Sequence, residues 1–208
     1  LGSREQLGGL LAAGLLLGGL AITSLSSYPL FHSLAEVFSI LVAFGAFMIA
    51  WDTRRLTDIG FFLFLGIAAL AAGGLDLVHT LAYKGMGVFP GYDADLPTQL
   101  WIAARALQAV SFLVAPWFLA RRCSPWRALL AYAAIDTLVL VAIFSGRFPT
   151  CFVEGVGLTR FKVVSEYVIS GILLAALGLL ARQRQAFPPH VWRLLRGSLL
   201  LTVGSELA

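Results

Sequence analysis

The feature of this sequence that most limits its fold is a succession of long apolar runs. Each run is close to the roughly 20 residues that an α-helix needs to cross the hydrocarbon core of a bilayer. Short segments rich in Pro, Gly, Ser or charged residues separate them. The runs are Leu7–Leu25, Leu30–Ala50, Ile59–Tyr83, Gln99–Ala120, Trp126–Ser145, Lys162–Ala181 and a seventh that begins near Val191. The sequence therefore predicts an all-α fold, a polytopic bundle of seven transmembrane helices.

The composition agrees with a membrane protein. Hydrophobic residues make up 59% of the chain and charged residues 12%, whereas soluble domains have roughly 45–50% apolar and about 25% charged residues. The formal net charge is +4, but the basic residues separate the apolar runs instead of forming one cluster. We therefore expect the lipid bilayer as a partner and no nucleic acid.

The distribution of Lys and Arg predicts the orientation, because cytoplasmic segments carry the excess of basic residues. Ten lie in the N-terminus and in the segments after the second, fourth and sixth runs: Arg4, Arg54, Arg55, Arg121, Arg122, Arg127, Arg182, Arg184, Arg193 and Arg196. Four lie on the opposite side: Lys84, Arg147, Arg160 and Lys162. This bias predicts a cytoplasmic N-terminus. It also puts Cys123 and Cys151 on opposite faces of the membrane, so we expect no disulfide between them.

Residues 1–208 are predicted to form a single transmembrane domain. The sequence stops inside the apolar segment "LLLTVGSELA". We therefore expect the seventh span to be incomplete and further sequence to follow Ala208.

Polar residues collect in the outer half of the predicted bundle. An ionisable side chain at the centre of a transmembrane helix costs roughly 2.5–3.5 kcal/mol or more, so such residues normally face the bundle interior and find partners there. The topology places the following residues near the outer ends of their helices: His32, Glu36, Asp76, His79, Gln99, Trp101, Arg105, Glu166 and Glu206. This convergence predicts a polar pocket that opens outward.

Two pairs in this set have the spacing of metal ligands. His32 and Glu36 are four residues apart, and Asp76 and His79 are three apart, so each pair shares one helix face. Two imidazoles and two carboxylates suit a transition metal such as Zn²⁺, Fe²⁺ or Mn²⁺. Alternatively, each carboxylate orients the neighbouring imidazole without any metal, or His32 and His79 are the axial ligands of a haem.

The loop "YKGMGVFPGYDADLPTQLW" is a candidate lid over a ligand pocket. Cationic, amide and aromatic side chains at its ends and facing it predict an anionic or polar small molecule as ligand. The candidate ligand-binding residues are Lys84, Gln99, Trp101, Arg105 and Glu166. Alternatively, the aromatic residues form an interfacial belt, Lys84 is an interfacial anchor, and Asp95 or Thr98 caps the next helix.

Several of these motifs resemble one known family. "LFHSLAEVFSILVAFGAFMIAW", "LDLVHTLAYKGMGVFP", "TQLWIAAR" and "SEY" are similar to the third type of bacterial membrane-associated sensor (MASE) domain, over most of the chain from about Leu30. The resemblance implies a multi-pass sensory input domain of the bacterial inner membrane. It also implies that a cytoplasmic output module follows, a histidine kinase or a diguanylate cyclase, and that the protein acts as a homodimer. The resemblance implies no particular ligand.

The leading hypothesis is therefore a sensory domain that binds a ligand or a metal in its outer pocket. An intramembrane metal-dependent hydrolase and a haem protein are the alternatives. Against an enzyme, the third histidine, His190, lies on the other side of the predicted membrane, and no Ser has a base in register with it. We assign no catalytic residue to this domain.

Overall fold

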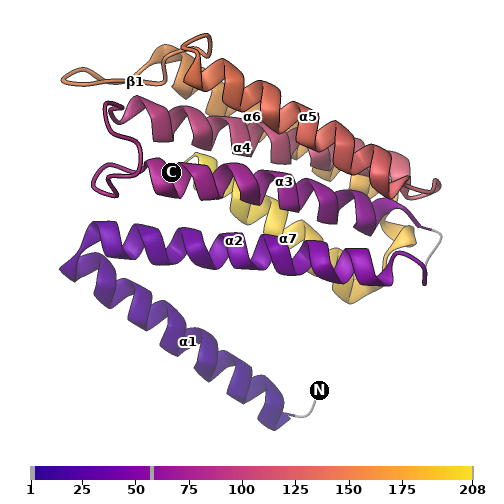
Figure 1. Ribbon diagram of the computed structural model, residues 1–208. Coiled ribbons are helices and arrows are strands. Elements are labelled where there is room, and N and C mark those ends of the chain that lie inside the picture. Colours follow the sequence, from indigo (N-terminus) through magenta and orange to yellow (C-terminus); the bar gives the residue numbers. More distant parts are fainter. Residues whose placement is uncertain (1–2, 57–58, 208) are drawn as a thin grey trace. The chain divides into compact units, whose positions relative to one another are not determined.

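The computed structural model describes residues 3–56 and 59–207 (Figure 1). Within these residues the chain forms seven α-helices, two short 3₁₀ helices and one small β-hairpin. The helices are α1 (Ser3–Ser26), α2 (Tyr28–Thr53), α3 (Phe61–Ala82), α4 (Asp95–Val114), η1 (Ala115–Phe118), α5 (Pro125–Phe144), α6 (Arg160–Arg182), η2 (Arg184–Ala186) and α7 (Pro189–Glu206), and the strands are β1 (Phe152–Val153) and β2 (Gly157–Leu158). The predicted all-α class is confirmed.

Among the described residues, five helices are long and apolar enough to cross a membrane. They are α2, α3, α4 together with η1, α5 and α6. The last helix, α7, has only 18 residues and includes Arg193, Arg196 and Glu206, which lowers its apolar character. Seven spans and a cytoplasmic N-terminus therefore remain predictions, while five candidate spans are observed.

The start of α4 differs from the prediction. The helix begins at Asp95 instead of Gln99, because Pro97 is tolerated in the first turn of a helix, where its missing N–H needs no partner. The alternative in which Asp95 or Thr98 caps this helix is wrong. Its N-cap is Ala94, without a side-chain cap, and the Thr98 hydroxyl donates to the Ala94 carbonyl at 2.7 Å. The Asp95 side chain is engaged elsewhere, by the loop before α6.

The chain divides into two compact units, residues 1–39 and residues 40–208. The first contains α1 and the beginning of α2. The two helices are joined at Ser27, whose N–H donates to the Thr23 carbonyl and whose own carbonyl accepts from Phe31 N–H. Leu25 and Phe38 are exposed in this unit, as expected of side chains that meet lipid tails.

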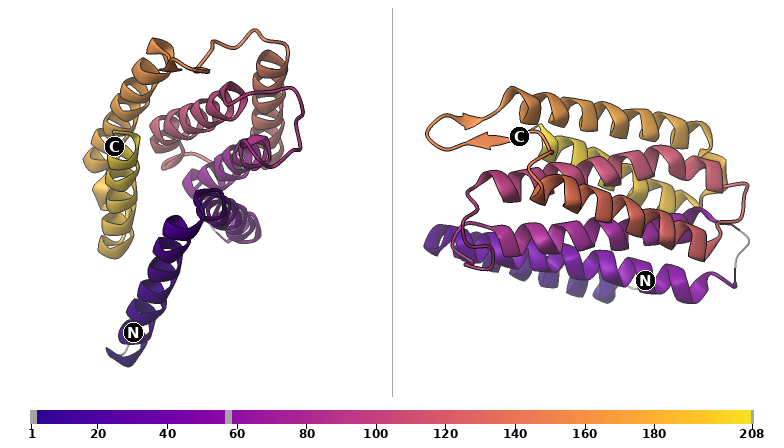
Figure 2. Two further views of the ribbon diagram at one scale, coloured as in Figure 1. Left: turned by 90° about the vertical axis from the view of Figure 1, so that its left-hand side faces the viewer. Right: turned by 45° about the horizontal axis from the view of Figure 1, so that its top comes forward.

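The second unit is built around α3. This helix contacts α4 and α5, α4 also contacts α6, and α6 contacts α7; Figure 2 shows these helices from two further sides. Phe61, Ile67 and Leu75 of α3 are fully buried. Gly66 permits a close approach to the C-terminal half of α2, since a Cβ at this position would lie 2.5 Å from Ala50 Cβ. The small residues of α3 therefore make it the central helix of this unit.

The segment between α5 and α6 contains a β-hairpin, where the sequence predicts only a short connection between two apolar runs. Phe152 pairs with Leu158 and Val153 with Gly157, in antiparallel register. Gly155 has a φ of +81° and Gly157 a φ of +103°, values that glycine adopts at little cost. The hairpin lies at the end of the unit where α6 begins.

Gly60 fixes the loop between η1 and α5 against the start of α3. Its N–H donates to the Arg121 carbonyl at 3.0 Å, and an added Cβ would lie 2.4 Å from Cys123 N and 2.7 Å from Arg121 O. We expect Gly60→Ala to destabilise the protein by about 1–3 kcal/mol, because backbone atoms must move to admit the methyl group. Thermal unfolding in detergent measures this effect. Gly74→Ala is the control, since a Cβ there meets nothing within 4 Å; equal stability of the two variants would contradict the expectation.

Candidate functional site

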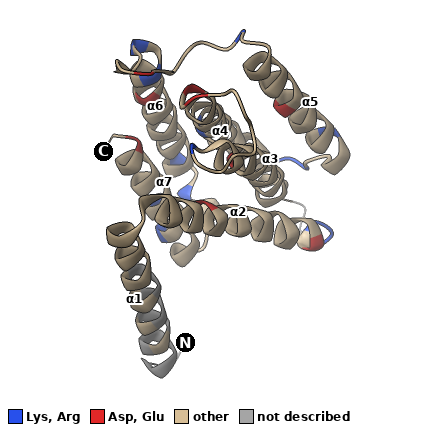
Figure 3. Cartoon of the chain, turned by 60° about the vertical axis from the view of Figure 1, so that its left-hand side comes forward, with Lys and Arg blue, Asp and Glu red and all other residues tan. Residues whose placement is uncertain are grey.

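Polar side chains collect at one end of the second unit, where α3 and α5 end and α4 and α6 begin. Figure 3 marks acidic and basic residues at the starts of α4 and α6 and in the loops that precede these two helices. Five of these groups are buried or nearly so in a largely apolar bundle, namely Asp76, His79, Gln99, Arg105 and Glu206. Because buried charges are costly unless they are paired, their partners define what this end of the unit can do.

Asp76 and Arg105 form an ion pair between α3 and α4. Arg105 Nη2 donates to both carboxylate oxygens of Asp76, at 3.2 and 3.1 Å, and the side chains of Asp76 and Arg105 are 7% and 18% exposed, respectively. Arg105 Nη1 donates to the Gln108 amide oxygen at 2.9 Å. The Asp76 carboxylate therefore serves as the counter-ion of Arg105.

His79 has a fixed ring orientation one turn further along α3. Its Nδ1 lies 2.8 Å from the Pro97 carbonyl oxygen. A carbonyl only accepts, so Nδ1 carries a proton, and in the neutral form of the ring the lone pair is then on Nε2. This tautomer is the one in which a histidine ligates a metal through Nε2 while its other nitrogen donates to the backbone.

Asp95 and Gln99, in the first turns of α4, hold the loop that leads to the hairpin. Asp95 Oδ1 accepts from the backbone N–H groups of Cys151 at 2.6 Å and Phe152 at 2.8 Å. Asp95 Oδ2 accepts from Gln99 Nε2 at 3.1 Å, and the same Nε2 lies 3.2 Å from the Pro149 carbonyl. These two side chains therefore attach the segment after α5 to the start of α4.

The Cys151 thiol lies beneath this attachment and is fully buried. Burial raises its pKa to about 12, with a further contribution from the Asp95 carboxylate. Burial also raises the pKa of the Cys123 thiol. Both cysteines are free, and their protonated thiols are poor nucleophiles and poor metal ligands.

Lys162 brings a second ion pair to this end of the unit. Its Nζ pairs with Glu166 one turn along α6 and lies 5.1 Å from the centre of the Trp101 ring. Glu206, at the end of α7, is 6% exposed and is within electrostatic range of Arg105, Lys162, Glu166 and Asp76. Charged groups from α3, α4, α6 and α7 therefore interact with one another.

A pocket of about 400 Å³ opens beside these groups. Its walls come from the end of α3, the first turns of α4, the hairpin and the start of α6. Trp101 and Pro97 supply apolar surface, and His79, Lys84 and Lys162 supply polar groups. At its rim Lys84 forms an ion pair with Glu154 of the hairpin at 3.0 Å, with both side chains largely exposed. The lining therefore combines apolar surface with polar and basic side chains.

The five predicted ligand-binding residues have different positions relative to this pocket. Lys84 and Trp101 line it. Glu166 pairs with Lys162, which lines it, whereas Gln99 holds the loop before the hairpin and Arg105 pairs with Asp76. A ligand contact of any of the five stays a prediction.

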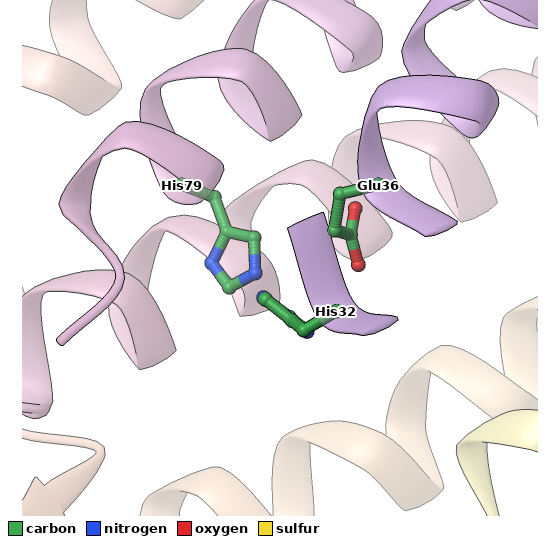
Figure 4. Close-up of side chains that lie close together, drawn as sticks. All are labelled: His32, Glu36 and His79. Carbon is green, nitrogen blue, oxygen red and sulfur yellow. The ribbon is translucent and has the colours of Figure 1, made fainter. Parts of the chain in front are cut away.

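The predicted metal ligands belong to both units. Figure 4 shows His32 and Glu36, which leave α2 one turn apart, and His79 on α3. His32 and Glu36 are part of residues 1–39, and Asp76 and His79 are part of residues 40–208. The metal site that these four residues would form together stays a prediction.

Sequence reasoning missed three contributors to this region. Asp95 is a loop anchor, Lys162 lines the pocket, and the hairpin residues Phe152 and Leu158 form one of its walls. The sequence contains a signal for two of them. Glycines in "FVEGVGL" are typical of a hairpin connection, and Lys162 and Glu166 have the spacing of a helical ion pair.

The family of this chain follows from a match that covers most of its length. A family model of the membrane-associated sensor domain MASE3 matches residues 23–208. The chain belongs to this family. The matched part of the MASE3 domain runs from the end of α1 to α7 and includes all residues that line the pocket. With five apolar helices long enough to span a bilayer, the MASE3 domain is a multi-pass membrane protein with a sensory role. Neither the curated proteins nor the solved structures include a match to this chain.

Proposed function

We propose that this MASE3 domain is a sensory input domain that binds a small anionic ligand in the pocket between α3, α4, the hairpin and α6. The observation that carries the proposal is the lining of that pocket. Lys84 and Lys162 contribute positive charge, and Trp101 contributes a flat apolar surface. None of the described residues that line the pocket is acidic, but Lys84 and Lys162 are paired with Glu154 and Glu166 beside it, so an anion with an apolar body would bind by replacing one of these carboxylates.

Lys162 is the residue best placed to respond to such a ligand. It is paired with Glu166, and its side chain is only 13% exposed. A ligand carboxylate would compete with Glu166 for the ammonium group, and this competition would alter the first turns of α6. Because α6 also contacts α7, the end of the domain would respond to occupancy.

Signalling requires the ligand to favour one arrangement of the helices over another, since equal affinity for both arrangements transmits nothing. We propose that α7 passes the change to a cytoplasmic output module, a histidine kinase or a diguanylate cyclase of a bacterial inner-membrane protein that acts as a homodimer. Substrate turnover by the membrane domain alone would favour the intramembrane hydrolase instead.

A binding screen tests the ligand proposal. The domain in phosphatidylcholine nanodiscs is titrated with a panel of aromatic and aliphatic carboxylates while its thermal unfolding is followed. We expect one or more of these compounds to raise the unfolding temperature. Lys162→Gln and Trp101→Ala should each lower the affinity for that compound by about tenfold, the usual effect of losing one charged or stacking contact.

Arg160→Gln is the matched control. It removes one positive charge from the first turn of the same helix, but Arg160 is exposed and does not line the pocket. A loss of affinity in Arg160→Gln as large as in Lys162→Gln, or the absence of binding by the whole panel, would count against the proposal.

A transition metal is the second candidate ligand, and the orientation of His79 favours it. With Nδ1 donating to Pro97, the Nε2 lone pair has the geometry of a metal ligand held by a backbone acceptor. His32 and Glu36 are the sequence-predicted partners. Asp76 is less suited, because both of its oxygens accept from Arg105. Zn²⁺, Fe²⁺ and Mn²⁺ fit two imidazoles and a carboxylate, and a haem would need the two histidines alone.

Elemental mass spectrometry of the purified protein tests the metal. We expect near-stoichiometric metal in the wild type. His79→Ala and Glu36→Ala should each reduce the metal content at least tenfold, since the loss of a residue that only hydrogen-bonds to a metal ligand already lowers metal affinity by about 10–100-fold. His190→Ala, outside the predicted set, should retain the metal. A metal-free wild-type protein that remains folded and signals normally would exclude this candidate.

A further inference from the structure

A second pocket lies at the opposite end of the same unit, where α3 and α5 begin. Its volume is about 530 Å³. Arg54 and Arg55, which follow α2, line it together with Arg122 of the loop before α5, Gly60 and Trp126. None of the described residues in its lining is acidic. Three guanidinium groups therefore share one cavity.

One of these arginines is held in place by an aromatic residue. Arg54 Nη1 donates to the Trp51 carbonyl, and the guanidinium lies 4.1 Å from the centre of the Trp51 ring. Arg55 and Arg122 are exposed. A guanidinium that is already oriented loses little freedom when it binds an oxyanion, and its planar fork matches two phosphate oxygens.

The two helix starts at this pocket add to its positive character. Gly60 is the N-cap of α3 and Ser124 the N-cap of α5, and neither helix has a side-chain cap. The first N–H groups of a helix carry partial positive charge and favour an anion nearby. The hydrogen bond from Gly60 N–H to the Arg121 carbonyl fixes these two walls to each other. The arginines thus line a cavity in which a backbone hydrogen bond joins two of the wall segments.

The surroundings of the pocket are those of a membrane interface. Trp126 is 69% exposed and meets Trp51 edge to face, with ring centres 5.6 Å apart. Leu56 is 83% exposed beside the arginines. Exposed Trp beside apolar and basic residues is typical of the depth at which lipid headgroups lie.

We propose that this basic pocket binds a phosphate group, supplied by the headgroup of an anionic lipid. The phosphate bridges Arg122 of the loop before α5 to Arg54 and Arg55 at the end of α2, and so fixes these segments to the start of α3. The site is separate from the pocket near Trp101 and does not depend on the proposed sensory ligand. A free phosphate has the same chemistry, and the experiment distinguishes the two sources.

Lipid retention tests the proposal. The full chain is reconstituted in nanodiscs of phosphatidylcholine with one-fifth phosphatidylglycerol, transferred to detergent and measured by native mass spectrometry. We expect bound phosphatidylglycerol, and at least a tenfold loss of it in Arg55→Gln/Arg122→Gln, which leaves the contact between Arg54 and Trp51 intact. Arg184→Gln/Arg193→Gln is the matched control, because it removes the same charge from exposed residues outside the lining.

The second arm uses phosphatidylcholine nanodiscs with inorganic phosphate in the buffer. If millimolar phosphate raises the unfolding temperature of the wild type and the double variant abolishes this effect, the site is supported, with free phosphate as the source of the bound group. If the double variant does not fold, the single variant Arg55→Gln, at an exposed position, replaces it. We expect the amount of phosphatidylglycerol bound to this variant to fall several-fold. Equal loss in the pocket and control variants, or no loss in either, would overturn the proposal.

Discussion

Replacing Arg105 by Ala is expected to destabilise the protein by about 3–5 kcal/mol, the usual effect of removing one partner from a buried ion pair. The Asp76 side chain is 7% exposed, and both of its carboxylate oxygens accept from Arg105. The variant leaves that carboxylate without the guanidinium charge in a largely apolar helix interface. Reversible unfolding in mixed detergent, followed by Trp fluorescence, measures the change in free energy.

Two further variants make this result specific. Asp76→Asn/Arg105→Gln removes both charges and should recover more than half of the lost stability, since two neutral amides can bond to each other. Lys84→Ala breaks the exposed pair with Glu154 and should cost no more than about 1 kcal/mol. If Arg105→Ala were no worse than Lys84→Ala, the pair would not stabilise the contact between α3 and α4.

The helices of this protein could be predicted because long apolar runs and their breakers determine them locally. The predicted run Trp126–Ser145 corresponds to α5 (Pro125–Phe144), and the predicted run Lys162–Ala181 corresponds to α6 (Arg160–Arg182). Pro125 at the first position of α5 and Thr159, whose hydroxyl accepts from Lys162 N–H, are ordinary start signals. Such signals act over a few residues, so sequence alone was sufficient.

The end of the bundle at which the polar groups lie could also be predicted, but their partners could not. The rise of a helix gives the depth of Asp76 and Arg105 and puts both in the same half of the bundle. Which side chains meet depends on how each helix is rotated about its axis, and packing against other helices sets that rotation. The pairing of Asp76 with Arg105, 29 residues apart, is therefore a result of the structure.

The loop residues were the hardest to predict. From the sequence, Asp95 is one of two alternative helix caps, since an acidic residue at the start of a helix usually acts locally. In the structure its carboxylate accepts hydrogen bonds from backbone N–H groups 56 and 57 residues further along the chain. A contact between residues so far apart produces no periodic pattern in the sequence. The role of Asp95 as a loop anchor and the position of the hairpin in the pocket wall therefore emerge only from the structure.

Asp95 is accordingly the second position at which a large effect is expected. Asp95→Ala removes the acceptor of the Cys151 and Phe152 N–H groups and of one Gln99 N–H. An unsatisfied buried donor costs about 1–3 kcal/mol. We therefore expect a loss of about 2–4 kcal/mol, or local release of the hairpin with a smaller global loss. Hydrogen exchange at the Cys151 and Phe152 amides distinguishes the two, because released amides exchange at least a hundredfold faster.

Asp95→Asn is the matched variant. Its amide oxygen can still accept from one or both backbone N–H groups but lacks the negative charge, so its stability should fall between those of the wild type and Asp95→Ala. The same series should weaken any ligand of the nearby pocket in the same order, since Phe152 and Leu158 form one of its walls. Protected amides at Cys151 and Phe152 in Asp95→Ala would show that the hairpin is held by other contacts. The pocket would then owe its shape to the packing of the helices alone.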